Sequence, residues 1–245
     1  MIKWFSSFRR SSLDSLDFTV LKTDMHSHLI PSIDDGSKGI EETIQLITAL
    51  KNLGFSKIIT TPHTMSDYYK NTKEIINKGT YEVCEEIKKR DLQIEFNSAS
   101  EYYVDYDFRQ KIGKSQFLTF GSKYLLIEFP FIEKPKDIDE IIFQLQLSGY
   151  NIVLAHPERY LYYTNNDLKK FIKKGVLLQL NLLSITGYYS KKVRNNAEKL
   201  INENMISFAG SDCHNMHHVI KLKECLTNPL WHKLSRSGNL LNNTL

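Results

Sequence analysis

Histidines and carboxylates occur in closely spaced groups along this 245-residue chain, and such groups are the usual material of metal sites. One group, DMHSH, contains His26 and His28, and another, SDCH, contains Asp212 and His214. Side chains two residues apart on an extended segment project to the same side, so each pair can chelate one ion. Neutral imidazole and carboxylate are ligands of Zn, Mn, Fe and similar divalent ions. These groups therefore indicate a metal site.

Further candidate ligands lie between these two groups: Asp35, His63, Glu101, Glu128 and His156. One ion takes about four to six donors, so this number of side chains indicates more than one ion. Multi-metal sites of this kind activate water and hold the oxygens of a phosphoryl group, and Glu101 could bridge two ions. Arg159 lies three residues after His156, and its planar guanidinium suits phosphate oxygens. The pattern favours phosphoryl chemistry.

Some neighbouring polar residues have more than one interpretation. Of Asp34 and Asp35, one could cap the loop while the other binds a metal, and the sequence leaves the choice open. For His217, His218 and His232, a surface or hydrogen-bonded role is the simpler interpretation when each is taken alone.

Short aliphatic runs alternate with segments of helical periodicity along the chain. The runs predict seven buried parallel strands, over residues 18–23, 57–61, 93–98, 124–129, 151–155, 176–182 and 205–209. The periodic segments predict helices over residues 41–53, 74–90, 138–147, 167–173 and 191–203. Gly54, Gly149 and Gly175 stand where helices should end.

This alternation of strand and helix predicts an α/β fold with a parallel sheet, best satisfied by a closed or nearly closed seven-stranded barrel. We expect a single domain over residues 18–245, preceded by an N-terminal extension of residues 1–17. The C-terminal ends of barrel strands share one rim, and the candidate ligands follow the predicted strands. The fold would therefore bring them into a common space.

Composition excludes several classes of protein. The net charge of +4 is spread along the chain rather than gathered in a stripe, so we expect no nucleic-acid partner. Three cysteines make no regular disulfide framework, which favours the cytoplasm, and Cys213 is expected to be a packing residue. No run of about 18 apolar residues predicts a membrane span. The opening residues, MIKWFSSFRR, do not form a secretory signal, so any membrane contact would be peripheral.

The motifs together resemble those of the polymerase and histidinol phosphatase (PHP) superfamily, and in particular its bacterial tyrosine phosphatases encoded with capsule and exopolysaccharide genes. The resemblance covers about Leu21 to Leu226. It is carried by DMHSHLIP from Asp24, DDGS from Asp34, TPH from Thr61, EY from Glu101, Glu128, AHPER from Ala155 and SDCH from Ser211.

The resemblance implies a distorted (β/α)7 barrel of the PHP type with up to three divalent ions, usually Mn2+ and sometimes Fe or Zn. It implies that His26, His28, Glu101 and Asp212 hold the first ion, that Glu101, Glu128 and His156 hold the second, and that Asp35, His63 and His214 hold the third. Residues of the third group would act in catalysis together with Arg159, which would steady the phosphate.

The reaction implied is hydrolysis of phosphotyrosine by a metal-activated water, without a covalent intermediate on the enzyme. The implied substrate is the tyrosine-rich tail of a bacterial tyrosine kinase that controls polysaccharide export. An aromatic-rich rim would accept an aryl phosphate, and the tyrosines expected in loops after the second and third strands are Tyr68, Tyr69, Tyr102, Tyr103 and Tyr106.

One segment departs from the family pattern. Relatives often carry a second phosphate-binding arginine a few residues after the Asp-x-His motif, whereas this chain has none there. His217, His218 or Lys221 could take its place.

Two other functions remain open from the sequence. A small-molecule phosphoesterase such as a histidinol phosphatase would share the metal ligands but would need a deeper pocket. A non-catalytic module stabilised by metal is the second alternative, although a structural site usually closes with about four ligands.

Overall fold

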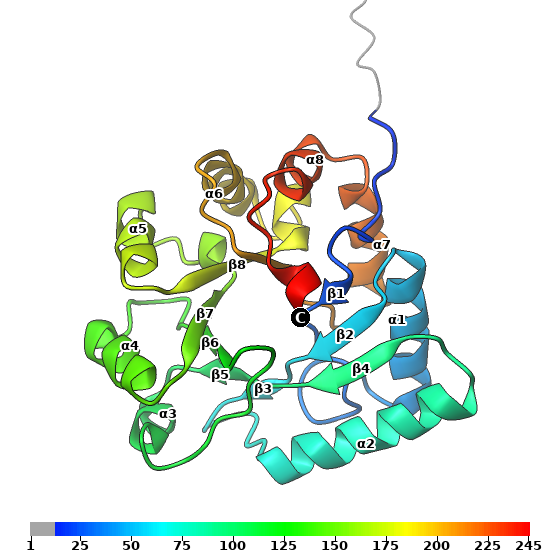
Figure 1. The fold of residues 1–245 in the computed structure, drawn as a ribbon, viewed down its shortest axis with the longest axis horizontal. Helices are drawn as coiled ribbons and strands as arrows, with labels where there is room; N and C mark the ends of the chain where they lie inside the picture. The colour runs from blue at the N-terminus through cyan, green and yellow to red at the C-terminus, as the bar shows by residue number, and fades with distance from the viewer. Residues whose placement is uncertain (1–12) are drawn as a thin grey trace, which may run out of the picture.

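The computed structural model describes residues 13–245, so most of the predicted extension over residues 1–17 lies outside the described residues. Within the described part, a curled parallel sheet is surrounded by helices (Figure 1). The predicted α/β fold with a barrel-like parallel sheet is confirmed.

The strands form two hydrogen-bonded sheets in which all neighbouring strands are parallel. The first has the order β1-β2-β4, with β1 at Thr23–Asp24, β2 at Lys57–Thr60 and β4 at Glu95–Ser98. The second has the order β3-β5-β6-β7-β8-β9, with β3 at His63–Thr64, β5 at Glu101–Tyr103, β6 at Tyr124–Glu128, β7 at Asn151–Ala155, β8 at Leu177–Asn181 and β9 at Phe208–Gly210. A bridge between Ser27 and Cys213 links the segments that follow β1 and β9, so the two sheets share one curl.

The described residues contain nine strands rather than the seven predicted, because two short strands, β3 and β5, follow β2 and β4 beyond the predicted ranges. Thr61 and Pro62 separate β2 from β3, and proline has no N–H with which to continue the hydrogen-bond ladder. The third predicted strand is present as β4, but Glu101 opens the additional strand β5 instead of lying in a loop after β4. The prediction for residues 18–23 was largely wrong: residues 18–21 form a turn and bend, and the strand begins only at Thr23. Lys22 takes a left-handed φ of 60° that a strand does not allow.

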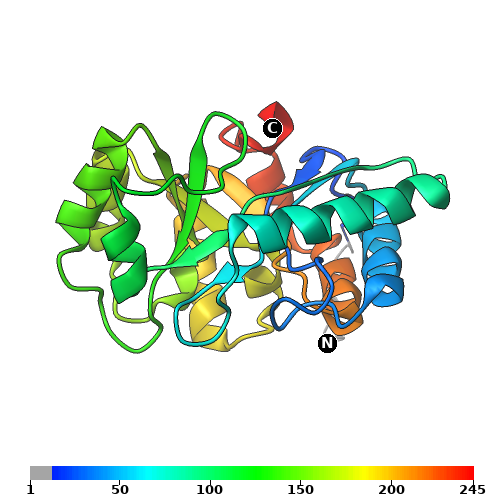
Figure 2. The same ribbon diagram turned by 90° about the horizontal axis from the view of Figure 1, so that it is seen from below.

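The predicted helices are present with ends within two residues of those expected. They are α1 at Ile40–Asn52, α2 at Lys73–Lys89, α4 at Ile138–Leu147, α5 at Asn165–Lys173 and α6 at Lys191–Asn202. The sequence did not predict α3 at Tyr106–Lys111, α7 at Met216–Cys225 or α8 at Pro229–Ser235. The long α2 lies on the outside of the first sheet, against β4 and α1 (Figures 1 and 2). No helix within residues 13–245 is both long and apolar enough to cross a membrane.

Alternate residues of the strands face two different cores. Leu125 and Ile127 of β6 pack outward under the helices, whereas Leu126 packs inward with Val153 of β7 and Phe208 of β9. The C-terminal residues pack against this inner cluster, and in Figure 1 the C-terminus lies at the centre of the ring of strands. Apolar side chains therefore fill the inside of the curl, and the polar site lies beyond them at the carboxyl ends of the strands.

Candidate metal centre

Four buried side chains from three separate parts of the chain meet at the carboxyl ends of the strands: His26, His28, Glu101 and Asp212, here called the central tetrad. The two imidazole Nε2 atoms lie 3.4 Å apart. Oε2 of Glu101 is 3.3 Å and 3.5 Å from these two atoms, and Oδ1 of Asp212 is 3.5 Å and 3.4 Å from them. A tetrahedral ion with ligands at roughly 2.1 Å holds them about 3.4 Å apart. The tetrad therefore has the dimensions of a metal site.

The outer nitrogens of both tetrad histidines are held by neighbours. Nδ1 of His26 donates to the amide oxygen of Gln179 at 2.9 Å, and Nδ1 of His28 donates to the carboxylate of Asp34 at 2.8 Å. With the proton on Nδ1, each Nε2 presents its lone pair to the centre of the tetrad. Such hydrogen bonds are what orient histidine ligands in metal sites.

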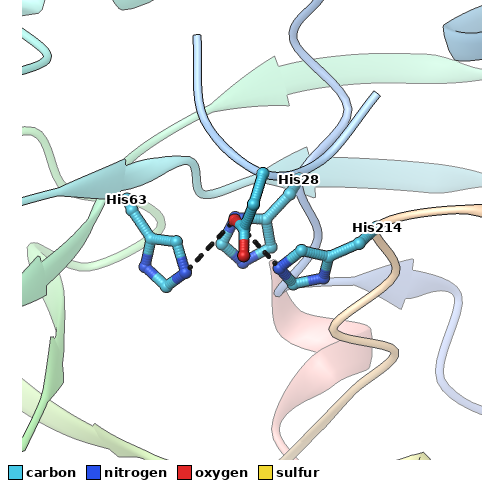
Figure 3. A group of neighbouring side chains, drawn as sticks. His28, His63 and His214 are labelled. Carbon is cyan, nitrogen blue, oxygen red and sulfur yellow. Dashed lines mark ion pairs between the residues drawn. The ribbon is translucent and has the colours of Figure 1, made fainter. Parts of the chain in front are cut away.

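The structure separates the roles that the sequence left open for Asp34 and Asp35. Asp34 is buried and accepts hydrogen bonds from His28 and from the backbone N–H groups of Gly36 and His63, so its oxygens are used in positioning. The Asp35 side chain is 51% exposed, and its Oδ1 lies 3.4 Å from Nε2 of His214 and 3.7 Å from Nε2 of His63. Figure 3 shows His28, His63 and His214 grouped at this point. Asp35 is therefore the candidate ligand of the two.

The remaining predicted ligands extend the cluster on the other side of the tetrad. Nε2 of His156 lies 3.0 Å from Oε1 of Glu101 and 3.6 Å from Oε1 of Glu128. Nδ1 of His63 lies 3.0 Å from Oε2 of Glu101, while its Nε2 faces Asp35. The structure thus brings all nine predicted ligands together, with Glu101 at the centre and His63 between two groups.

Burial and mutual charge shift the pKa values of these groups in opposite directions. Burial opposes a charged His26, but the carboxylates of Glu101 and Asp212 outweigh it and raise the pKa of His26 to about 9. Burial and repulsion from Glu101 raise the pKa of Glu128 to about 8. Burial, together with the charge of Arg159, lowers the pKa of His156 to about 4. Such opposed shifts within one cleft are typical of functional sites.

Within residues 13–245, one carboxylate oxygen in the cluster faces imidazole nitrogens without accepting a hydrogen bond: Oε2 of Glu101, which lies 3.0 Å from Nδ1 of His63 and 3.3 Å from Nε2 of His26. This oxygen is buried. A buried charged oxygen without a hydrogen bond is costly, whereas a cation beside it removes that cost. This atom, the spacing of the tetrad and the chemistry of its donors all fit bound divalent ions.

A cavity of about 530 Å³ opens above the cluster. Most of the candidate ligands border it, and its walls also include Tyr69, Tyr103 and Arg159. Nη1 of Arg159 donates to Oδ2 of Asp212 at 3.1 Å, which places the guanidinium beside the tetrad. The cavity therefore combines candidate ligands, a phosphate-binding side chain and aromatic walls.

The predicted substrate contacts are only partly brought to this cavity. His218 borders it, whereas His217 is exposed and lies outside its wall. Tyr102 lies in β5, not in a loop as expected. Its ring packs in the core, and its hydroxyl accepts a hydrogen bond from the N–H of Leu118. The amine of Lys221 pairs with Glu224 on the surface of α7.

Sequence reasoning missed several residues that the structure places at the site. Gln179 holds His26, and its position two residues before Asn181 on one strand could have indicated that it shares the inward face. Phe131 and Tyr189 contact Arg159, but both lie in loops, for which the sequence carries no periodic signal.

Comparison with known proteins shows the family of this chain. Residues 22–235 match the family described as capsular polysaccharide synthesis, CpsB/CapC. Tyrosine-protein phosphatase YwqE of Bacillus subtilis is 31% identical over 196 residues, covering 79% of this chain and 77% of the relative. Tyrosine-protein phosphatase CpsB of Streptococcus agalactiae is 30% identical over 201 residues, covering 79% and 83%.

A solved structure shares the fold as well as the sequence pattern. It comes from a study of YwqE from Bacillus subtilis and CpsB from Streptococcus pneumoniae, described as metal-dependent tyrosine phosphatases. The TM-score is 0.77 at 29% identity, and the match covers 87% of this chain and 89% of that one. The resemblance seen in the motifs is thus confirmed across nearly the whole chain, and the protein belongs to the CpsB/CapC family of capsular polysaccharide synthesis.

Proposed function

We propose that this protein is a metal-dependent phosphatase that hydrolyses phosphotyrosine in a protein substrate. The observation that carries the proposal is the central tetrad, which has the dimensions of a metal site and opens into a cavity bordered by Arg159. The relatives named above, all tyrosine phosphatases, support the same activity.

We assign the ligands of three divalent ions as the motifs imply. The first ion is held by His26, His28, Glu101 and Asp212, the second by Glu101, Glu128 and His156, and the third by Asp35, His63 and His214. We propose Mn2+ as the native ion, with Fe or Zn as the alternatives. When bound, such ions supply Lewis acidity toward the phosphoryl oxygens and lower the pKa of water.

The remaining roles belong to side chains around the cavity. Arg159 carries a fixed positive charge beside the tetrad and holds the phosphate oxygens. Tyr69 and Tyr103 give the cavity walls on which an aryl group can lie. His218 is the better placed of the two histidines proposed to replace a second arginine, because it borders the cavity.

No cysteine is suited to act as the nucleophile. Cys213 and Cys225 are buried, and burial raises the pKa of both thiols. Cys84 lies on α2, outside the cavity wall. This arrangement fits attack by water rather than by a thiolate.

We further propose that residues 18–245 form one domain, that residues 1–17 extend from it, and that the protein acts in the cytoplasm. The physiological substrate we propose is the tyrosine-rich tail of a bacterial tyrosine kinase that controls polysaccharide export. The support is the family itself, whose description refers to capsular polysaccharide synthesis.

The test is hydrolysis of a phosphotyrosine peptide and of histidinol phosphate by metal-stripped protein, with and without Mn2+. We expect Mn2+-dependent turnover of the peptide that His156→Ala and Arg159→Ala abolish, while Arg194→Ala on the exposed face of α6 leaves it unchanged. Preference for histidinol phosphate would replace this function by a metabolic one. Absence of turnover of both substrates by metal-loaded protein would leave only a binding role.

A further inference from the structure

The guanidinium of Arg159 lies against the faces of two aromatic rings. Its central carbon is 4.2 Å from the ring centroid of Tyr189 and 4.6 Å from that of Phe131. Phe131 belongs to the loop between β6 and α4, and Tyr189 follows the 3-10 helix η2 at Leu182–Thr186. Two loops from different strands therefore converge on one arginine side chain.

These contacts stabilise the charge without occupying its hydrogen-bond donors. Within residues 13–245, the guanidinium of Arg159 makes one hydrogen bond, from Nη1 to Oδ2 of Asp212. A guanidinium has five N–H groups, and a ring face attracts the cation while leaving its edge free. A second carboxylate in place of the rings would consume the donors that a phosphate needs. The aromatic contacts thus hold Arg159 in place and leave its donors available.

Both rings are themselves anchored. The hydroxyl of Tyr189 accepts a hydrogen bond from Nδ2 of Asn181 at 2.7 Å and lies 3.4 Å from Oδ2 of Asp212. The ring of Phe131 stacks on that of His156, with centroids 5.8 Å apart and an interplanar angle of 21°. The residue is nevertheless 42% exposed and borders the cavity, so core packing does not explain a phenylalanine there.

We propose that Phe131 and Tyr189 are positioning residues that form an aromatic clamp on Arg159 and direct its free N–H groups at the phosphate of the substrate. An unrestrained arginine loses rotamer entropy when it binds an anion, and holding the side chain beforehand removes that loss. The inference rests on the proposed function for the identity of the substrate. Its own consequence is the binding of phosphate, which requires no turnover.

The experiment is calorimetric titration of inorganic phosphate into Mn2+-loaded protein. We expect Phe131→Leu and Tyr189→Leu each to weaken phosphate binding about three- to tenfold, while Tyr189→Phe, which keeps the ring, retains affinity within about twofold. Tyr81→Leu, on the exposed side of α2, is the matched control and should bind as the wild type does. The Mn2+ content of each variant is measured alongside, because Phe131 touches His156.

A background without the arginine separates the clamp from a general structural effect. In Arg159→Ala protein, adding Phe131→Leu or Tyr189→Leu should produce no further loss of phosphate affinity, since the clamp has nothing left to hold. Additive losses in that background would overturn the proposal, as would wild-type affinity in both leucine variants, or a wild-type protein that does not bind phosphate.

The clamp and the proposed function can fail separately. Turnover of p-nitrophenyl phosphate is measured on the same samples, where we expect the leucine variants to raise KM more than they lower kcat. Phosphate binding that depends on the clamp, combined with no turnover of any phosphate ester, would sink the phosphatase assignment and keep the clamp. Normal turnover together with a phosphate affinity that is insensitive to both rings would overturn the clamp and keep the phosphatase assignment.

Discussion

Oδ2 of Asp34 lies 2.8 Å from Nδ1 of His28, and this buried contact decides which nitrogen of the histidine faces the tetrad. The same oxygen accepts the backbone N–H of His63, so one carboxylate holds the side chain of His28 and the backbone of a second segment. The loop that carries it must pass very close to the His28 backbone. A β-carbon at Gly36 would overlap the carbonyl oxygen of His28, which is why glycine is required there.

Replacing Asp34 should weaken metal binding without unfolding the protein. In Asp34→Ala, His28 loses the acceptor that fixes its tautomer, and the affinity for Mn2+ should fall roughly 10- to 100-fold. Titration of Mn2+ into metal-stripped protein measures this. The control is Asp67→Ala, an exposed residue for which no role at the site is proposed. Unchanged affinity in Asp34→Ala would show that the contact does not orient the ligand.

Glu101 should be the side chain on which the metal cluster most depends. Its two oxygens face His26, His28, His63 and His156. Glu101→Gln therefore removes a charge that the first two proposed groups share and that also faces His63 of the third. Bound metal stabilises the folded state by mass action, so Mn2+ should raise the Tm of the wild type and EDTA should lower it. The Tm of Glu101→Gln should respond much less to both. A full response to Mn2+ in this variant would place the metal elsewhere.

Metal-free protein should lose stability as the pH rises from 6.5 to 9. The pKa of His26 is raised to about 9 in the fold, above its ordinary value, so the stability it contributes is complete below pH 6.5 and is lost through pH 9. The pKa of Glu128 is raised to about 8 in the fold, so this group also lowers the stability of the folded state as the pH rises toward 8. Thermal unfolding across this window measures the effect.

The metal-loaded protein should behave differently over the same range. Binding of an ion displaces the proton from His26, so the affinity for Mn2+ should rise with pH, by up to about tenfold per unit for each proton released. Its Tm should therefore fall less than that of the metal-free form. Parallel curves for the two forms would show that this histidine is not a ligand.

Alkylation of thiols should leave the proposed activity intact. Cys213 and Cys225 are buried with raised pKa values, whereas Cys84 is half-buried on α2. Iodoacetamide should label native protein at Cys84 at most, as mass spectrometry would show, with turnover unchanged. Inactivation that follows labelling of Cys213 would contradict a water-based reaction.

The sequence by itself determined the elements that depend on local pattern. The helix α4 and the strand β7 have the bounds that their periodicity predicted, and Gly54, Gly149 and Gly175 take positive φ values after their helices. The motifs were recognisable because the donors stand beside strands, whose aliphatic runs are easy to read. The metal chemistry follows from the residue types, which the sequence gives without a structure.

Tertiary structure alone decided which way the side chains point and what they meet. Asp34 and Asp35 are neighbours in sequence, yet one orients His28 and the other faces His214, because the loop passes tightly over the His28 backbone. The clamp on Arg159 joins segments separated by about thirty residues on either side. Such contacts depend on the face of the sheet to which the side chains at the end of each strand point. A shift of one residue in register would turn every side chain of a strand to the opposite face, and the register is set by packing between elements that are distant in the sequence.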